Sequence, residues 1–171
     1  MADRAATAHV HPVVIEVASA AETTALGKRL ASVLFPGAVI ALVGQLGAGK
    51  TFLVRAIAEG LGIADSRVVT SPTFVLIQEY GASLPMYHFD AYRLLTQAEF
   101  VDLGVHEYFE GRGVSFVEWA DRVEGCLPLD HLRVTLEITG PETRRIELKA
   151  FGERYAAILE KFRQVAPQAK S

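Results

Sequence analysis

The chain contains a single cysteine, Cys126, among its 171 residues. One cysteine cannot form a disulfide within the chain, and this scarcity is typical of proteins that work in a reducing compartment such as the cytoplasm. A free cysteine usually packs as a small hydrophobic side chain, so we do not expect Cys126 to act as a nucleophile. The five histidines are scattered and lack the spacing of a zinc site. We therefore expect a cytoplasmic protein without structural zinc.

Long apolar runs and dense basic clusters are missing as well. No apolar segment approaches the ~18 residues of a membrane-spanning helix, and residues 1–11 lack the apolar core of a secretory signal. The formal net charge is -3, without a concentrated Lys/Arg block. A protein that grips a nucleic-acid backbone by itself usually carries a basic surface. We therefore expect no membrane association, and we expect any link to RNA to be made through partner proteins.

Asparagine is absent altogether. GTPases usually read guanine through an Asn-Lys-x-Asp element, and no Thr-Lys-x-Asp substitute is present either. The catalytic-loop asparagine of protein kinases is also excluded. For a nucleotide-binding protein, these absences favour ATP over GTP.

What the chain does contain is enough apolar material for a sizeable core. Hydrophobic residues make up 50% of the sequence, which excludes a disordered protein. The length is typical of one domain. We predict a single domain over residues 1–171, with loose tails at 1–11 and 165–171.

The most informative segment is Gly44-Gln45-Leu46-Gly47-Ala48-Gly49-Lys50-Thr51, which fits the pattern G-x-x-x-x-G-K-[ST] at every fixed position. The apolar run 38–43 before it predicts a buried strand, and residues 51–59 after it predict a helix. Strand, glycine-rich loop and helix are the context that a phosphate-binding loop requires. The plainer alternative, a glycine-rich turn before an ordinary helix, explains the full match less well.

Each fixed residue type in this pattern has a chemical task. Gly44, Gly47 and Gly49 have no Cβ, so the backbone can approach phosphate oxygens closely and direct its N–H groups toward them. The following helix adds unpaired N–H donors and the positive end of its dipole. Lys50 is suited to bridge the β- and γ-phosphates, and the Thr51 hydroxyl is suited to bind Mg²⁺.

The remaining periodicities predict an α/β protein, namely a P-loop NTPase-like three-layer sandwich with a mixed sheet and a C-terminal antiparallel hairpin. Two capping boxes are expected, with Ser19 and Glu22 opening one helix and Thr96 and Glu99 another. The expected strands are 13–17, 74–80, 86–90, 114–118, 132–138 and 145–149, and the expected helices are 19–34, 96–101 and 153–162.

Two acidic residues end predicted strands. Glu118 follows the apolar run 114–117, and Asp90 follows 86–89. Ligands collect at the carboxyl ends of parallel strands, so both acids are expected to face the phosphate loop. A surface acid or a helix cap is the alternative for each.

Two neighbours of these acids have open interpretations. The only tryptophan, Trp119, either packs in the core or lines the nucleotide site. His88 is expected to be a structural, hydrogen-bonded histidine rather than a catalytic one.

Four motifs together resemble the TsaE (YjeE) family, the P-loop ATPases of bacterial tRNA threonylcarbamoyladenosine biosynthesis. The resemblance covers about residues 22–122. The loop alone is unspecific, and the combination in this order is specific. The motifs are the phosphate loop, Thr70-Ser71-Pro72-Thr73-Phe74, Tyr87-His88-Phe89-Asp90-Ala91-Tyr92-Arg93-Leu94 and Val117-Glu118-Trp119.

The resemblance implies an ATPase that acts with the partners TsaB and TsaD, which transfer a threonylcarbamoyl group to adenosine 37 of tRNA. TsaE would bind the TsaB–TsaD complex and hydrolyse ATP to reset it, so tRNA is reached indirectly. Residues 70–74 would form a switch-like loop that responds to the γ-phosphate. Two departures, Gln45 in place of an acid and Ala120 in place of proline, remove no required ligand.

The resemblance also assigns roles to individual residues. Lys50 and Asp90 would be catalytic, with Lys50 on the phosphates and Asp90 on the attacking water or the metal's shell. Thr51 and Glu118 would ligate Mg²⁺. The residues expected to bind ATP are Thr23, on the adenine side, and Gly44, Gln45, Leu46, Gly47, Ala48, Gly49, Lys50 and Thr51.

Two other functions remain open. A P-loop small-molecule kinase would need a lid, for which residues 110–113 are a thinly supported candidate. A nucleotide-gated binding module would use binding rather than hydrolysis to drive assembly. Arg93 is expected to be structural rather than an arginine finger, and Tyr92, Phe100 and Tyr108 are plausible contributors to a partner surface.

Overall fold

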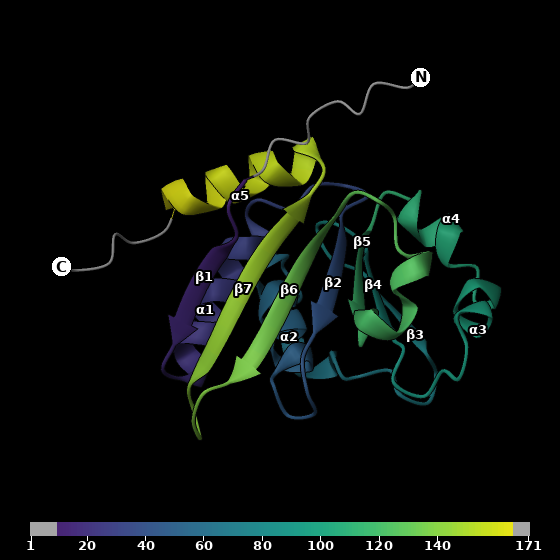
Figure 1. The fold of residues 1–171 in the computed structure, drawn as a ribbon, viewed down its shortest axis with the longest axis horizontal. Coiled ribbons are helices and arrows are strands. Elements are labelled where there is room, and N and C mark those ends of the chain that lie inside the picture. Colours follow the sequence, from purple (N-terminus) through teal and green to yellow (C-terminus); the bar gives the residue numbers. More distant parts are fainter. Residues whose placement is uncertain (1–9, 166–171) are drawn as a thin grey trace.

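The computed structural model describes residues 10–165 and contains a seven-stranded mixed sheet (Figure 1). The strand order is β1-β7-β6-β2-β5-β4-β3. The central strands are parallel, and β1, β7 and β3 pair antiparallel with their neighbours. The predicted mixed sheet and C-terminal hairpin are therefore confirmed. The strands are β1 Val13–Val17, β2 Val39–Val43, β3 Ile77–Tyr80, β4 Met86–Asp90, β5 Val114–Glu118, β6 His131–Ile138 and β7 Arg144–Phe151.

Helices cover both faces of the sheet, but not to the same extent (Figure 1). One face packs against α1, α2 and α5. On the other face, α3, α4 and the 3₁₀ segment after β5 cover the half of the sheet formed by β2, β5 and β4. The helices are α1 Ala20–Ala31, α2 Lys50–Gly60, α3 Gln97–Asp102, α4 Val105–Phe109 and α5 Glu153–Val165, with 3₁₀ segments at Ser66–Val68 and Ala120–Cys126.

The uncovered half of that face belongs to the C-terminal hairpin and β1. Arg145 there lies within salt-bridge distance of Glu16, Glu137 and Glu147. Antiparallel strands commonly keep one face in water in this way. The three-layer arrangement thus holds over the parallel strands that end at the phosphate loop.

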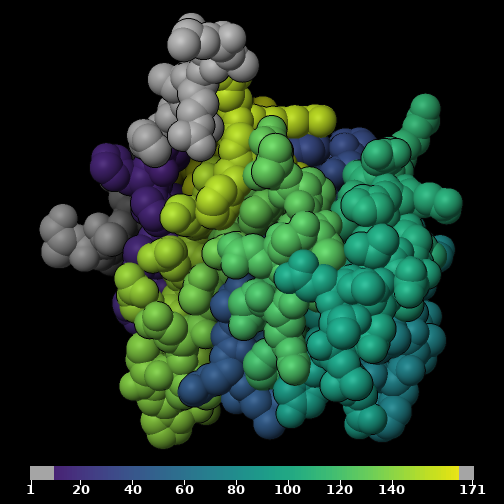
Figure 2. Space-filling view, turned by 45° about the vertical axis from the view of Figure 1, so that its right-hand side comes forward, coloured from purple at the N-terminus to yellow at the C-terminus, as the bar shows by residue number. Residues whose placement is uncertain are grey.

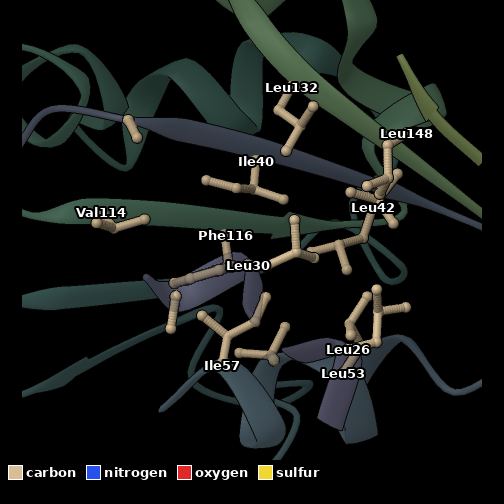
Figure 3. Close-up of a cluster of buried hydrophobic side chains, with 14 of the residues drawn as sticks. Leu26, Leu30, Ile40, Leu42, Leu53, Ile57, Val114, Phe116, Leu132 and Leu148 are labelled. Atoms are coloured by element: carbon tan, nitrogen blue, oxygen red, sulfur yellow. The ribbon is translucent and has the colours of Figure 1, made fainter. Parts of the chain in front are cut away.

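The main core lies between the sheet and helices α1 and α2 (Figure 3). Close approach of α1 to α2 depends on Gly27, because a Cβ there would lie 2.4 Å from the Cβ of Ala56. This packing holds α2 against the sheet and so sets the position of its N-terminus. The side chains labelled in Figure 3 are Leu26, Leu30, Leu53 and Ile57 from the helices and Ile40, Leu42, Val114, Phe116, Leu132 and Leu148 from the sheet.

Both predicted capping boxes are present. The Ser19 hydroxyl accepts the Glu22 N–H at 3.2 Å, and Thr96 accepts the Glu99 N–H at 3.3 Å. In each case the glutamate accepts the N–H of the residue before the cap, which is Ala18 or Leu95. The reciprocal bond therefore lies one residue earlier than the usual capping box places it.

Three predicted boundaries were wrong. The strand expected at 74–80 begins only at Ile77, because residues 73–75 form a turn, in which the Leu76 N–H bonds to the Pro72 carbonyl oxygen instead of to a neighbouring strand. The helix expected to reach Leu34 ends at Ala31, where Ser32 bonds back to the Arg29 carbonyl oxygen. The last helix continues to Val165, so that residue does not start a tail.

Other differences concern short or marginal elements. The five-residue helix α4 gave no usable periodicity, and β7 extends past residue 149 to Phe151. The predicted tails lie mostly outside the described residues, in 1–9 and 166–171. Within residues 10–165, no helix is long and apolar enough to cross a membrane.

Candidate functional site

The loop between β2 and α2 turns tightly into the helix, and glycine makes this possible at two positions. Gly49 caps α2 with φ of 103°, in the left-handed region, and contributes no side-chain cap. The first N–H groups of α2 are therefore directed at the loop without a side-chain acceptor. A Cβ on Gly44 would lie 2.6 Å from the Leu136 carbonyl oxygen, so β6 approaches the loop too closely for any other residue.

Lys50 lies folded over this loop and is 5% exposed. Its Nζ donates to the carbonyl oxygens of Gly44 at 2.5 Å and Gln45 at 3.1 Å. Nζ also lies 3.9 Å from the centroid of the Trp119 ring, a cation–π contact. Burial lowers the pKa of Lys50 below its usual value, and the negative charges of Glu118 and other nearby acids oppose this shift.

Glu118, the last residue of β5, reaches the start of α2. Its Oε1 accepts a hydrogen bond from the Thr51 hydroxyl at 2.7 Å and lies 2.7 Å from Nε2 of the fully buried His88. A carboxylate oxygen accepts hydrogen bonds, so Nε2–H is the donor of this contact. The Nδ1 atom has no hydrogen-bond partner within residues 10–165. His88 is therefore the hydrogen-bonded histidine that was expected, with Glu118 as its partner.

Asp90 ends the neighbouring strand β4 and is paired in register with Glu118. Its Oδ2 accepts from the hydroxyls of Ser71 and Thr73, the latter at 3.2 Å. Its Oδ1 accepts the Tyr92 N–H at 2.8 Å. The carboxylate thus ties the irregular segment after residue 69 to the end of the sheet.

These residues share one cavity of about 390 Å³. Both acids were predicted to face the loop, and they do. The cavity is lined by Lys50, Thr51, Asp90 and Glu118. Trp119 also lines this cavity and has a φ of 58°, a rare backbone conformation for a bulky residue. The lining residues are Leu46, Gly47, Gly49, Lys50, Thr51, Phe52, Ser71, Thr73, Asp90, Tyr92, Glu118 and Trp119.

Four of the expected ATP-binding residues do not line this cavity, namely Thr23, Gly44, Gln45 and Ala48. Thr23 lines a second cavity of about 320 Å³, which is shared with Gly47, Ala48 and Gly49 of the loop. Gly44 and Gln45 border a hollow beside the end of β6. The loop therefore forms a wall between two cavities, with the carboxylates in one and Thr23 in the other.

Some contacts around the cavity were not predicted from the sequence. Ser71 and Thr73 lie in the motif at 70–74, but the hydrogen bonds of their hydroxyls to Asp90 were not predicted. Arg144, which donates to the Ala48 carbonyl oxygen at 3.1 Å, carried no signal because it lies 96 residues away in the chain.

The lid proposed for a kinase was wrong. The Gly113 carbonyl oxygen accepts the Gly37 N–H at 3.0 Å, just before β2 and β5 begin. Residues 110–113 therefore lie at the opposite end of these parallel strands from Glu118.

Phe100, suggested as a partner contact, was also wrong, since it is fully buried. Tyr92 is partly exposed beside the cavity. Arg93 stacks on the exposed Phe74 ring, with its Cζ 4.2 Å from the ring centroid. This contact agrees with the structural role expected for Arg93.

The parallel strands, the glycine loop and the helix that follows define this chain as a P-loop α/β protein. A family model described as "Threonylcarbamoyl adenosine biosynthesis protein TsaE" matches residues 17–146. The chain therefore belongs to the TsaE family and has its role in tRNA threonylcarbamoyladenosine biosynthesis.

Individual relatives agree with the family match. The chain is 46% identical over 140 residues to the TsaE protein of Bacillus subtilis, covering 81% of this chain and 86% of that protein. It is 39% identical to TsaE of Treponema pallidum, over 75% of this chain and 93% of the relative. The crystal structure of Bacillus subtilis YdiB superposes with a TM-score of 0.79 at 38% identity, covering 91% of this chain and 96% of that one.

Proposed function

We propose that the chain binds and hydrolyses Mg-ATP to support threonylcarbamoyl transfer to adenosine 37 of tRNA, acting with TsaB and TsaD. The observation that carries the proposal is the meeting of Thr51 and Glu118 at 2.7 Å. Asp90 and Lys50 line the same cavity. This combination of a cation, a hydroxyl and two carboxylates suits a phosphate ester and its counter-ion.

The loop supplies the binding energy in this proposal. Backbone N–H groups and the α2 dipole attract the phosphates, and Lys50 gives up its contacts with the carbonyl oxygens of Gly44 and Gln45 for phosphate oxygens. Exchanging neutral acceptors for charged ones strengthens the hydrogen bonds of the ammonium. Thr23 and the second cavity are left for the adenine side of the nucleotide.

The ligand set also fits magnesium. The Thr51 hydroxyl and the Glu118 carboxylate are hard oxygen donors, which Mg²⁺ prefers. When bound with ATP, the ion would neutralise phosphate charge. His88 keeps Glu118 oriented, because its Nε2–H occupies one lone pair of Oε1 and so restricts rotation of the carboxylate.

Asp90 is assigned to the attacking water. A buried carboxylate beside the loop can accept a proton or orient a water by hydrogen bonding. Its present partners, the hydroxyls of Ser71 and Thr73, belong to the segment that the motif identifies as switch-like. If Asp90 binds a water instead of these hydroxyls, residues 70–74 would lose two of their hydrogen bonds and could change conformation.

The partner surface is placed at the mouth of the carboxylate cavity. Three large apolar residues are mostly exposed here, namely Leu46 of the glycine loop, Phe74 of the switch-like segment 70–74, and Val75 next to it. Exposed apolar groups gathered around a site are typical of protein-binding surfaces. We place the contact with TsaB–TsaD here, which would make partner binding depend on the bound nucleotide. We propose that this takes place in the cytoplasm.

The decisive experiment combines purified protein, TsaB, TsaD, tRNA and ATP. We expect tRNA modification over repeated turnovers to require ATP and to accompany release of inorganic phosphate. Transfer of phosphate to an added metabolite would indicate a kinase instead. Absence of ATP-dependent modification would reject the proposal.

A magnesium titration tests the metal assignment separately. The variant Glu118→Gln keeps the shape of the side chain but removes its charge. We expect it to need roughly ten times more Mg²⁺ for half-maximal ATP binding, because a charged oxygen ligand is replaced by a neutral one. A titration that matches the unaltered protein would contradict the role given to Glu118.

A further inference from the structure

Arg144, the first residue of β7, joins two segments that are far apart in the sequence. On one side, its Nε donates to the Ala48 carbonyl oxygen at 3.1 Å and its Nη2 to that of Gly47 at 3.4 Å. On the other side, Nη1 donates to the carbonyl oxygens of Gly140 at 3.1 Å and Thr143 at 2.9 Å. The guanidinium therefore bridges the phosphate loop and the β6–β7 turn, which lie at the same end of the sheet (Figure 1).

The surroundings of Arg144 differ from those of its neighbour Arg145. Arg145 points to the other face of the hairpin, among Glu16, Glu137 and Glu147. Arg144 has only neutral carbonyl oxygens as hydrogen-bond partners, and within residues 10–165 no carboxylate oxygen lies within 4.0 Å of it. A positive charge without a paired acid thus lies against the loop.

The contact with Ala48 also constrains the direction of a backbone amide. In a trans peptide the C=O and N–H groups point in opposite directions. Because the Ala48 carbonyl oxygen is held by Arg144, the Gly49 N–H of the same peptide is directed away from Arg144. Gly49 has left-handed backbone angles and borders both cavities, so an unheld peptide here would be free to rotate.

We propose that Arg144 is a positioning residue of the phosphate loop. It holds the Ala48–Gly49 peptide in the orientation that presents the Gly49 N–H to phosphate, and it adds an unpaired positive charge behind the loop. The inference rests on the proposed function, because it assumes that the loop binds the phosphates of ATP. Figure 2 shows the blue loop region at the lower edge of the molecule, beside the yellow-green hairpin that carries Arg144.

The test compares Arg144→Gln and Arg144→Lys with Arg145→Gln as the matched control on the next residue. Mg-ATP is titrated against the fluorescence of Trp119, the only tryptophan, whose ring contacts Lys50. We expect Arg144→Gln to weaken binding by about 10- to 100-fold, since charged hydrogen bonds and a nearby charge are lost. Arg144→Lys keeps the charge but not the planar fork, so a loss of about 3- to 10-fold is expected. Arg145→Gln should stay within about twofold.

A positioning role is separated from a merely structural one by two further readings. In steady-state hydrolysis, Arg144→Gln should raise KM far more than it lowers kcat. Millimolar guanidinium should restore affinity to Arg144→Ala by filling the vacated site, with no effect on Arg145→Ala. If thermal melting shows that Arg144→Gln fails to fold, Arg144→Lys carries the same comparison.

Two failures are distinguishable. If the unaltered protein does not bind Mg-ATP, the proposed function is overturned and this inference with it. If the unaltered protein binds Mg-ATP and Arg144→Gln or Arg144→Lys binds it equally well, only the role of Arg144 is overturned.

Discussion

The carboxylate cavity has two walls that are built differently. The first consists of the phosphate loop, the start of α2 and Glu118. The second consists of the segment 70–76 and Asp90. Both acids end adjacent parallel strands in register, and both are 3% exposed. Their partners differ, because Glu118 contacts Thr51 of a helix and His88 of a strand, whereas Asp90 contacts two hydroxyls of an irregular segment.

Two similar carboxylates at adjacent strand ends can therefore differ in how firmly their surroundings are held. Glu118 is bonded to regular secondary structure, whereas Asp90 is bonded to an irregular segment. The first wall is held by regular hydrogen bonding and by the packing of α2 against α1. Segment 70–76 has no regular structure of its own and exposes Phe74 to 82%. Segments with few buried contacts open at low free-energy cost, so we expect the second wall to move and the first to stay fixed.

The strongest test of the first wall is Lys50→Ala. The loop would keep its amides and lose its only ammonium, so we expect ATP affinity to fall by roughly 100-fold, in line with the loss of charged hydrogen bonds. Isothermal titration calorimetry measures the change directly. Unchanged affinity would mean that the loop does not hold the phosphates in the proposed way.

The matching test of the second wall is Asp90→Asn. The amide keeps the shape and loses the charge, so hydrolysis should fall by about 10²- to 10³-fold while ATP binding changes by less than about threefold. Single-turnover tRNA modification should survive and repeated turnover should be lost. If repeated turnover persists without hydrolysis, the protein is a nucleotide-gated binding module.

A smaller effect is expected from Phe74→Ser. Phe74 is exposed, so the free energy of unfolding should change by less than about 0.5 kcal/mol. Stimulation of hydrolysis by TsaB–TsaD should nevertheless fall several-fold, because an apolar contact at the cavity mouth is lost.

Leu129→Ser is the control for this prediction. Leu129 is 93% exposed and precedes β6, at the end of the sheet away from the loop. Equal loss of stimulation in both variants would show that the apolar surface at the mouth is not the partner site.

The smallest effect concerns pH and the nucleotide-free protein. Because burial lowers the pKa of Lys50, the folded state binds fewer protons than the unfolded state between that lowered value and the unfolded pKa of about 10.4. Stability contributed by Lys50 therefore rises with pH across this window. Lys50→Met removes the desolvation penalty, so the variant should be more stable than the unaltered protein at neutral pH.

Urea titrations of both proteins measure this difference at several pH values. The gap between the two free energies of unfolding should narrow as pH rises toward about 10.4. A gap that does not change with pH would show that the charge of Lys50 costs the folded protein nothing.

Features that depend on nearby residues were predictable from the sequence, and features that depend on distant segments were not. The glycine-rich loop at 44–51, its flanking strand and helix, and both capping boxes depend on neighbours within a few residues, and the structure confirms these local elements. The boundary at 74–77 failed for the opposite reason. Phe74 and Val75 look like strand residues, but only the position of β4 decides where pairing begins.

The roles assigned to Lys50, Asp90, Thr51, Glu118 and Thr23, and the single domain over the whole chain, remain predictions. Their arrangement is now known. Thr51 and Glu118 are 67 residues apart in sequence and share a hydrogen bond. The position of Glu118 at the end of a strand predicted that it would lie near the loop, because parallel strands have their carboxyl ends at one edge of the sheet.

The sequence alone determined the local chemistry, namely a glycine loop with an ammonium and a hydroxyl, two acids at strand ends, and membership of the TsaE family. Only the tertiary structure decided which hydroxyls bond to Asp90, that His88 bonds to Glu118, and that Arg144 reaches the loop. The physical reason is that strand order and helix packing bring these groups together over long separations, and no periodicity within the chain records such contacts.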